Sequence, residues 1–141
     1  MSRFTRLDLS EDLSWVPADF RRDAQGNVPL DTQTYIESYL ADPSEWHWST
    51  HDEPREIKLK RVMAILAKAR LPEHAKAVAQ LGVGPFEDMM SDWLLDRLEA
   101  YLPFDVALYT ALSGLYVFNE PPAVQDRLAR MMAASERARK K

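Results

Sequence analysis

Apolar residues recur at helical spacing through the middle and the end of the chain. Between residues 55 and 70, and again in three later segments, they follow the i, i+3, i+4, i+7 spacing of one buried helix face. A proline stands at the start of each segment, and a glycine follows several of the segments. Proline is common at the first position of a helix and glycine is common just after its end. The pattern predicts an all-α fold whose helices begin at Pro54, Pro72, Pro85, Pro103 and Pro121-Pro122.

The prolines also recur at a fixed offset. Pro54 and Pro85 are 31 residues apart, and so are Pro72 and Pro103. Aligned at this offset, the two segments share further identities: Glu56/Glu87, Ala69/Ala100, Leu71/Leu102 and Leu81/Leu112. Such a period is typical of helical-hairpin repeats, in which each unit buries its apolar face against the next. We therefore expect stacked antiparallel hairpins over 54–84 and 85–115, as in a small HEAT/armadillo-like bundle, with a C-terminal capping helix over 121–139.

The N-terminal part of the chain has a weaker pattern. Residues 1–30 hold apolar side chains without a sustained period, which predicts an irregular arm packed across the bundle. Residues 31–53 are predicted to form a short helix and a Trp-rich link. Asp31 is the expected cap of that helix, and its inward-facing residues are Tyr35, Ile36, Tyr39 and Leu40.

Two stretches carry a family resemblance. Leu81-Gly-Val-Gly-Pro-Phe-Glu-Asp-Met-Met90, followed by Pro103-Phe104 and Ala111-Leu-Ser-Gly-Leu115, resembles an uncharacterised bacterial family of the domain of unknown function 6869 type. Trp46-x-Trp48 is similar to it as well, and the likeness covers about residues 35 to 132. The family has no established activity. The resemblance therefore implies a shared helical fold and carries over no catalytic residue.

Length and composition narrow the classes that need to be considered. A chain of 141 residues with 46% apolar and 28% charged residues suits one globular domain. The absence of cysteine excludes disulfides, thiolate zinc sites and a cysteine nucleophile. The N-terminus lacks the apolar core of a signal peptide, and no apolar run approaches membrane-spanning length, so we expect a cytoplasmic protein without membrane contact.

Glu87 and Asp88 are the first candidates for chemistry. They could serve as a general base, or as metal ligands together with Asp92. The expected helix start at Pro85 favours a different role, because carboxylates in a first helical turn cap the helix and meet the positive end of its dipole. Glu56 occupies the equivalent slot of the first hairpin. Glu56, Glu87 and Asp88 are therefore predicted to be helix-capping carboxylates, and no catalytic residue is assigned.

His47 and His51 are weak metal-ligand candidates. If residues 46–52 were helical, the two imidazoles would share one face at i, i+4 spacing, with Asp52 or Glu53 nearby. The glutamate that follows the first histidine in zinc peptidases is missing. We predict no metal and no cofactor.

The tryptophans differ in what they indicate. Trp93 is in phase with its predicted helix and is expected in the core. Trp46 and Trp48 cannot both face one side of a helix, so one is expected to pack inward while the other lies at the surface or under the N-terminal arm. They form either a hydrophobic plug or part of a binding surface.

The net charge of −4 is the sum of alternating acidic and basic blocks along the chain. Residues 1–54, 55–76, 77–126 and 127–141 carry −7, +5, −7 and +5. In the third block four acidic residues recur at helical spacing and predict an acidic stripe on an outer helix face: Asp88, Asp92, Asp96 and Glu99. With Trp46 and Trp48 these form the candidate interaction surface. Separated acidic and basic blocks suit docking to a charged partner.

These observations favour a helical-repeat module that binds a protein partner, without catalysis. Two alternatives stay open: a small metal-dependent or carboxylate-based hydrolase, and a nucleic-acid accessory protein that uses the basic C-terminal tail. The sequence pI of 5.4 and the lack of a reading motif argue against nucleic acid. Homo-oligomerisation is left open.

Overall fold

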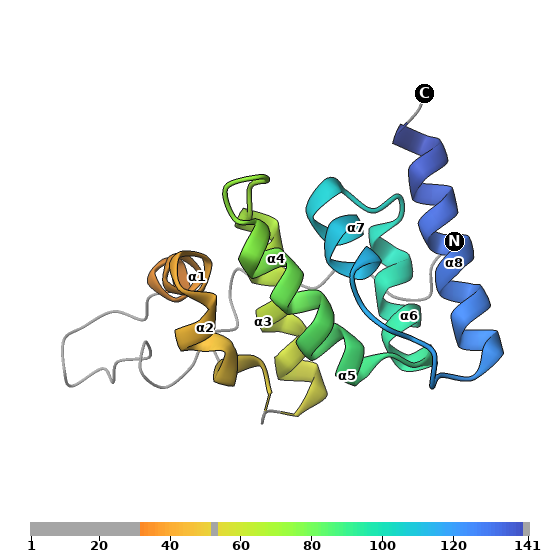
Figure 1. The fold of residues 1–141 in the computed structure, drawn as a ribbon, viewed down its shortest axis with the longest axis horizontal. Helices are drawn as coiled ribbons and strands as arrows, with labels where there is room; N and C mark the ends of the chain where they lie inside the picture. The colour runs from red at the N-terminus through yellow and green to blue at the C-terminus, as the bar shows by residue number, and fades with distance from the viewer. Residues whose placement is uncertain (1–31, 52–53, 140–141) are drawn as a thin grey trace.

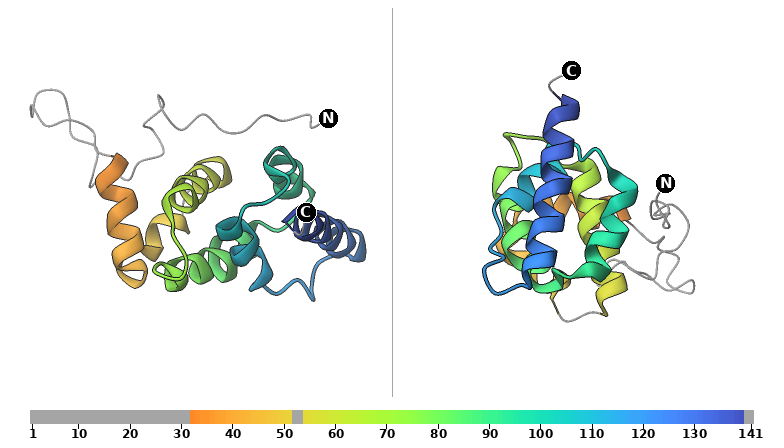
Figure 2. Two further views of the ribbon diagram at one scale, coloured as in Figure 1. Left: turned by 90° about the horizontal axis from the view of Figure 1, so that it is seen from above. Right: turned by 90° about the vertical axis from the view of Figure 1, so that its right-hand side faces the viewer.

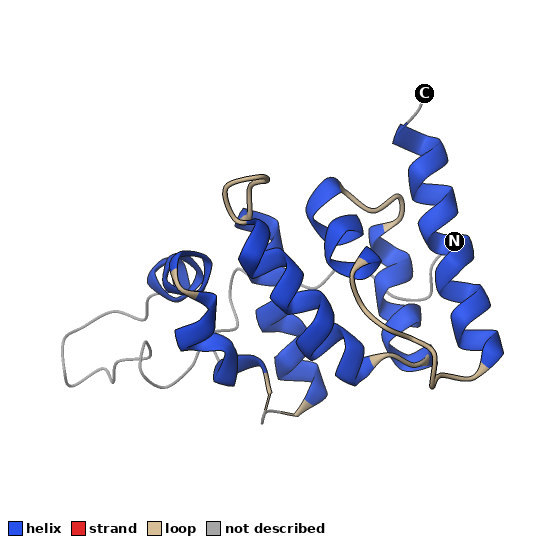
Figure 3. Ribbon diagram, in the orientation of Figure 1, coloured by secondary structure: helices blue, strands red, loops and turns tan. Residues whose placement is uncertain are grey.

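The computed structural model describes residues 32–51 and 54–139, and every regular element in these ranges is helical (Figure 3). No strand occurs in them. The all-α prediction is confirmed for this part of the chain. The predicted irregular arm over 1–30 and the expected cap Asp31 lie outside the described residues.

The elements form an elongated array with α1 at one end and α8 at the other (Figure 1). In chain order they are α1 Thr32–Ala41, α2 Pro43–Trp46, the 3-10 helix η2 His47–Thr50, α3 Arg55–Lys68, α4 Ala75–Leu81, the π-helix η3 Gly82–Phe86, α5 Glu87–Met89, α6 Asp92–Leu98, the 3-10 helix η4 Glu99–Tyr101, α7 Val106–Ser113 and α8 Pro122–Arg139. Seen from above, α3 and α6 lie on one side, while α4 lies on the other and packs against α7 (Figure 2).

The predicted helix faces form the core. The apolar residues expected inward at α7 and just before it are all buried: Phe104, which precedes the Asp105 cap, and Ala107, Leu108, Ala111 and Leu112 on the helix. Leu59, Val62, Met63 and Leu66 on α3 are buried too, as are Tyr35, Ile36 and Tyr39 on α1. Leu40, also expected inward on α1, is only partly buried. Helical periodicity therefore identified the buried face of these elements correctly.

Short polar side chains begin three of the helices. Asp42 caps α2 by accepting a hydrogen bond from the Glu45 N–H at 3.3 Å. Asp105 caps α7 by accepting from the Leu108 N–H at 2.9 Å, and Ser91 caps α6. These contacts satisfy N–H groups that a helix start leaves unpaired. The helix start predicted at Pro103 is therefore displaced to Val106, after the Asp105 cap.

The helix start predicted at Pro85 is wrong. The chain stays helical from Ala75 to Met89, through α4, the π-helix η3 and α5. A proline inside an α-helix removes a hydrogen bond and clashes with the preceding turn, and a π-helical turn is one way to absorb it. The break instead falls at Met90-Ser91, where the Met90 ψ of 119° turns the chain away.

Gly82 follows one of the predicted helical segments, but it is not a left-handed residue that ends a helix. Its φ is −69°, and none of the described glycines has a positive φ. Its small size serves a different purpose, since a Cβ at this position would lie 2.0 Å from the backbone oxygen of Ala111. Gly82 thus lets α7 approach the α4–η3 helix closely.

A buried arginine fastens η2 to α3. Arg61 is 2% exposed and donates a hydrogen bond to the Ser49 carbonyl oxygen. The Ser49 hydroxyl donates to the Trp46 carbonyl oxygen at 2.7 Å and also lies 2.8 Å from the Tyr35 hydroxyl. The predicted Trp-rich link is therefore a short helical segment with a fixed conformation.

Candidate functional site

Three of the predicted surface acids lie at the contact between α6 and α8. Asp92 and Asp96 on α6, and Glu99 on η4, surround the guanidinium of Arg127 on α8. Arg127 Nη1 donates to Asp92 Oδ1 at 3.0 Å, and Nη2 donates to Asp96 Oδ1 at 2.7 Å and to Glu99 Oε2 at 2.9 Å. We refer to these four residues as the Arg127 cluster.

The Arg127 cluster is part of the fold. The side chains of Arg127 and Asp96 are only 22% and 24% exposed. Burial lowers the pKa of Arg127, but the hydrogen bonds it donates to Asp96, Asp92 and Glu99 and the charge of Asp96 outweigh burial and raise its pKa. The predicted open acidic stripe is therefore not a free surface at these three positions, because their charge holds α8 in place.

Asp88, the fourth member of the predicted stripe, lies elsewhere. It belongs to α5, before the break at Met90, and so it does not continue the face of α6. Its Oδ2 lies 3.7 Å from Nδ1 of His51, and its side chain is 53% exposed. The break in the helix therefore separates Asp88, which lies near His51, from the three acids that surround Arg127.

The predicted capping role does not fit the carboxylates in the structure. Glu87 follows a helical residue on a continuous helix, so there is no helix start for it to cap. Its Oε1 instead accepts the Tyr116 backbone N–H at 2.7 Å. Glu56 does lie in the first turn of α3, where its charge suits the dipole, but the N-cap residue is Pro54, which has no N–H for a side chain to reach.

His47 and His51 are brought together by η2. Their ring centroids are 5.0 Å apart in an edge-on arrangement. Among the described residues, no group of three or more His, Cys, Asp or Glu side chains is placed to hold a metal ion. Asp52 and Glu53, which the sequence placed near this pair, lie outside the described residues.

The tryptophans follow the sequence prediction in part. Trp46 packs partly buried against the core while Trp48 is 45% exposed, so the expectation of one inward and one surface ring is confirmed. Their ring centroids are 5.7 Å apart. Trp93, expected in the core, is only half-buried, and the guanidinium carbons of Arg55 and Arg97 each lie 4.2 Å from its ring centroid.

Among the described residues, the most exposed large apolar side chains lie in a segment outside the predicted interaction surface. Tyr116 is 66% exposed and Phe118 is 81% exposed, with ring centroids 5.9 Å apart. Both belong to the connection between α7 and α8, residues 114–121, which we call the aromatic loop. Leu115 and Val117 pack partly buried against the core, so inward and outward side chains alternate from Leu115 to Phe118.

The aromatic loop is fixed at several points. The Glu87 carboxylate accepts a hydrogen bond from the Tyr116 N–H. The Glu120 N–H donates to the Val117 carbonyl oxygen at 3.0 Å, and Gln125 Nε2 donates to the Glu120 carbonyl oxygen at 2.8 Å. The two rings are therefore presented on an ordered backbone.

The sequence holds a signal for this site. Tyr116 and Phe118 alternate with apolar residues between Gly114 and Pro121, and this period of two does not fit a helix. An extended segment of this kind must turn every second side chain outward unless both its faces are covered. Such exposed aromatic residues are typical of binding surfaces.

Comparison of the chain with protein-family models, with curated proteins and with solved structures gives no match. Within the described residues, no helix combines the length and the apolar character needed to cross a membrane.

Proposed function

We propose that this protein is a non-catalytic protein-binding module of stacked helical hairpins, and that its partner docks on the aromatic loop. The exposed, ordered pair of rings at Tyr116 and Phe118 is the observation that carries the proposal. The surface differs from the acidic stripe that the sequence suggested, because the Arg127 cluster uses most of that stripe internally.

The repeat-like arrangement of the hairpins is supported by the positions of their second helices. α4 begins at Ala75 and α7 begins at Val106, again 31 residues apart. The matched residues Leu81 and Leu112 are both buried. We propose that α3–α4 and α6–α7 are the two units, and that the shared helical fold implied by the family resemblance has this form. Solenoids of such units typically bind other proteins.

Energetics favour the aromatic loop as a docking point. Transfer of one large apolar side chain from water into an apolar interface stabilises a complex by about 1.5–3 kcal/mol. Aromatic residues are enriched among the side chains that dominate binding free energies. Because Glu87 and the Glu120–Val117 turn already order the backbone, little conformational entropy is lost on binding.

The charges beside the aromatic loop indicate the chemistry of the partner. Glu87 contacts the loop directly, and Asp88 is the next residue. Neither carboxylate forms an ion pair with a lysine or arginine among the described residues, in contrast to the Arg127 cluster. We propose a partner segment that carries apolar side chains together with lysine or arginine, since a cation can meet both the carboxylates and the faces of the rings.

A comparison of two surface variants tests the proposal. Cross-linked partners of the full chain would be captured from the native host with the wild type, with Tyr116→Ser/Phe118→Ser, and with Val106→Ser as the control. Val106 is also an exposed apolar residue, at 52%, but it lies on α7 outside the aromatic loop. We expect the double variant to lose a specific partner that the control retains, with melting temperatures close to the wild type because all three side chains are exposed.

Three further outcomes of this test are informative. A partner segment rich in lysine or arginine and apolar residues, identified from the cross-links, would support the proposed charge complementarity. Equal capture by the double variant and the wild type would rule out the aromatic loop as the docking point. Loss of capture in both variants would show that general exposed apolar surface, and not this loop, accounts for the interaction.

A further inference from the structure

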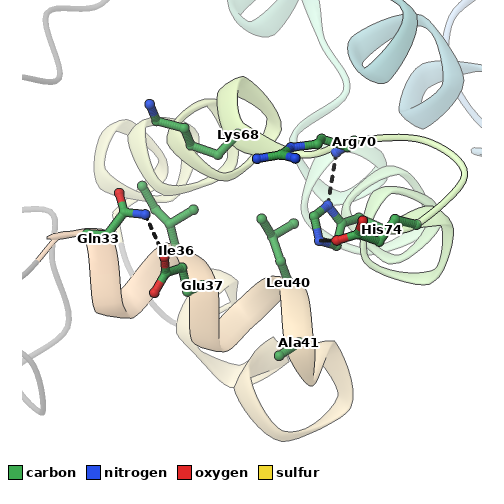
Figure 4. Close-up of a pocket in the computed structure, with 9 residues that line it drawn as sticks. Gln33, Ile36, Glu37, Leu40, Ala41, Lys68, Arg70 and His74 are labelled. Atoms are coloured by element: carbon green, nitrogen blue, oxygen red, sulfur yellow. Dashed lines mark hydrogen bonds and ion pairs between the residues drawn. The ribbon is translucent and has the colours of Figure 1, made fainter.

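A pocket of about 530 Å³ lies between α1 and the turn that joins α3 to α4 (Figure 4). Its volume falls in the range of sites that bind small molecules, roughly 300–1,000 Å³. Ile36 and Leu40 project from α1 and supply its apolar floor, while Lys68 and Arg70 belong to the opposite wall. The pocket is separate from the aromatic loop, and its use is independent of the proposed protein-binding function.

The two cations of the pocket have no carboxylate partner among the described residues. Neither Lys68 nor Arg70 forms an ion pair with any of them, and both are exposed. In Figure 4 the Arg70 guanidinium extends across the pocket above Leu40. The Arg70 backbone N–H donates to His74 Nδ1 at 2.9 Å, which fixes the turn that presents the side chain.

The acidic residues of the lining are already engaged. Glu37 Oε1 accepts a hydrogen bond from Gln33 Nε2 at 2.6 Å. Glu73 Oε2 lies 3.1 Å from Nε2 of His74. With two acidic and two basic side chains in the lining, the pocket has no excess charge for a multiply charged anion such as a phosphate. A single negative charge placed at Arg70 suits it better.

From these features we propose that the pocket binds one carboxylate carried on a short apolar body. The planar guanidinium of Arg70 matches a carboxylate with two parallel hydrogen bonds. The Lys68 side chain extends away from Arg70 (Figure 4) and is not part of this contact. The apolar body lies on Ile36 and Leu40. The ligand is either a small free carboxylic acid or the C-terminal carboxylate of a peptide that ends in an aliphatic residue, because both present the same group.

A titration of the ¹⁵N-labelled full chain tests this assignment. The probes are sodium octanoate, an acetylated tripeptide that ends in leucine with a free carboxylate, its C-terminal amide, and inorganic phosphate. We expect saturable amide shifts confined to the pocket segments with at least one of the two carboxylate probes, and none with the amide or with phosphate. Arg70→Gln should weaken that binding about tenfold, since one charge-assisted contact is lost.

Lys76→Gln is the matched control for Arg70→Gln. It removes one positive charge from an exposed residue near the start of α4 that does not line the pocket, and its affinity should equal that of the wild type. Binding of octanoate alone would identify a small acid, and binding of the peptide would identify a chain terminus. Equal binding of peptide acid and amide, an unchanged affinity in Arg70→Gln, or no shift with either carboxylate would overturn the proposal.

Discussion

Gly82 marks a close approach between two helices of the core. The Ala111 backbone oxygen occupies the place where a Cβ would stand, at 2.0 Å, and neither backbone can move aside as a flexible side chain could. The place of this glycine after a predicted helical segment suggests a helix end, because glycine commonly ends helices. Position 82 requires a small residue and not a special backbone conformation. The sequence alone does not reveal this, because the close neighbour, Ala111, lies 29 residues further along the chain.

Replacement of Gly82 by alanine should destabilise the protein. We expect Gly82→Ala to lower the free energy of unfolding by about 1–3 kcal/mol, the usual cost of overpacking. Gly114→Ala is the control, because nothing lies within 4 Å of a Cβ there and its φ of −94° suits alanine. Urea unfolding followed by circular dichroism measures both. A Gly82→Ala protein as stable as Gly114→Ala would contradict the proposed close approach.

The burial of Tyr39 makes the stability of the protein depend on pH. Its side chain is fully buried, and the hydroxyl accepts a hydrogen bond from Gln80 Nε2 at 3.0 Å. Burial raises the pKa of Tyr39 above 10.0, and the hydrogen bonds with Gln80 and Thr50 oppose this only in part. The folded state therefore favours the neutral phenol.

The raised pKa of Tyr39 predicts a loss of stability in alkali. Below pH 10 the phenol is neutral in both states; above it the unfolded chain releases the proton first, so the free energy of unfolding falls as pH rises. Tyr39→Phe should cost about 1 kcal/mol near pH 7 through the lost hydrogen bond. Above about pH 10, the free energy of unfolding of Tyr39→Phe should fall less with rising pH than that of the wild type. Parallel pH profiles from urea unfolding would exclude this role for Tyr39.

At the scale of elements, the spacing of apolar residues predicted the helices more accurately than the prolines and glycines predicted where the helices begin and end. The inward faces of α3, α7 and α8 were predicted from spacing alone and are buried, since an amphipathic helix must turn its apolar side to the core. The start expected at Pro85 was wrong because the π-helix η3 accommodates that proline and keeps Phe86 buried. Tertiary packing outweighs local helix signals at such a position.

The Arg127 cluster ties α8 to α6, and its loss should be measurable. Arg127→Ala leaves three carboxylates, one of them only 24% exposed, without their shared cation. We expect it to lower the free energy of unfolding by about 1–3 kcal/mol, as for other hydrogen-bonded, partly buried ion pairs. Arg130→Ala, at an exposed position on the same helix, should change it by less than about 0.5 kcal/mol. Equal losses of unfolding free energy in Arg127→Ala and Arg130→Ala would contradict the proposed role of the Arg127 cluster in holding α8 to α6.

At the scale of the whole molecule, the charge blocks of the sequence partly neutralise one another. Arg127 opens the basic block of residues 127–141 and lies on three acids of the preceding acidic block. Sequence reasoning found the acidic residues but placed them on a free surface, because it could not know which face α8 covers. It also missed the aromatic loop, whose exposure depends on how Leu115 and Val117 pack against helices distant in sequence.

Amide hydrogen exchange of the chain with and without its captured partner tests the proposed docking point most directly. We predict slower exchange in the complex for residues 114–121 and for the adjoining end of α5 around Glu87 and Asp88. The amides of the Arg127 cluster should exchange at similar rates in both states, since that cluster already serves the fold. Protection confined to α6 and α8, with unchanged exchange in the aromatic loop, would contradict the proposal.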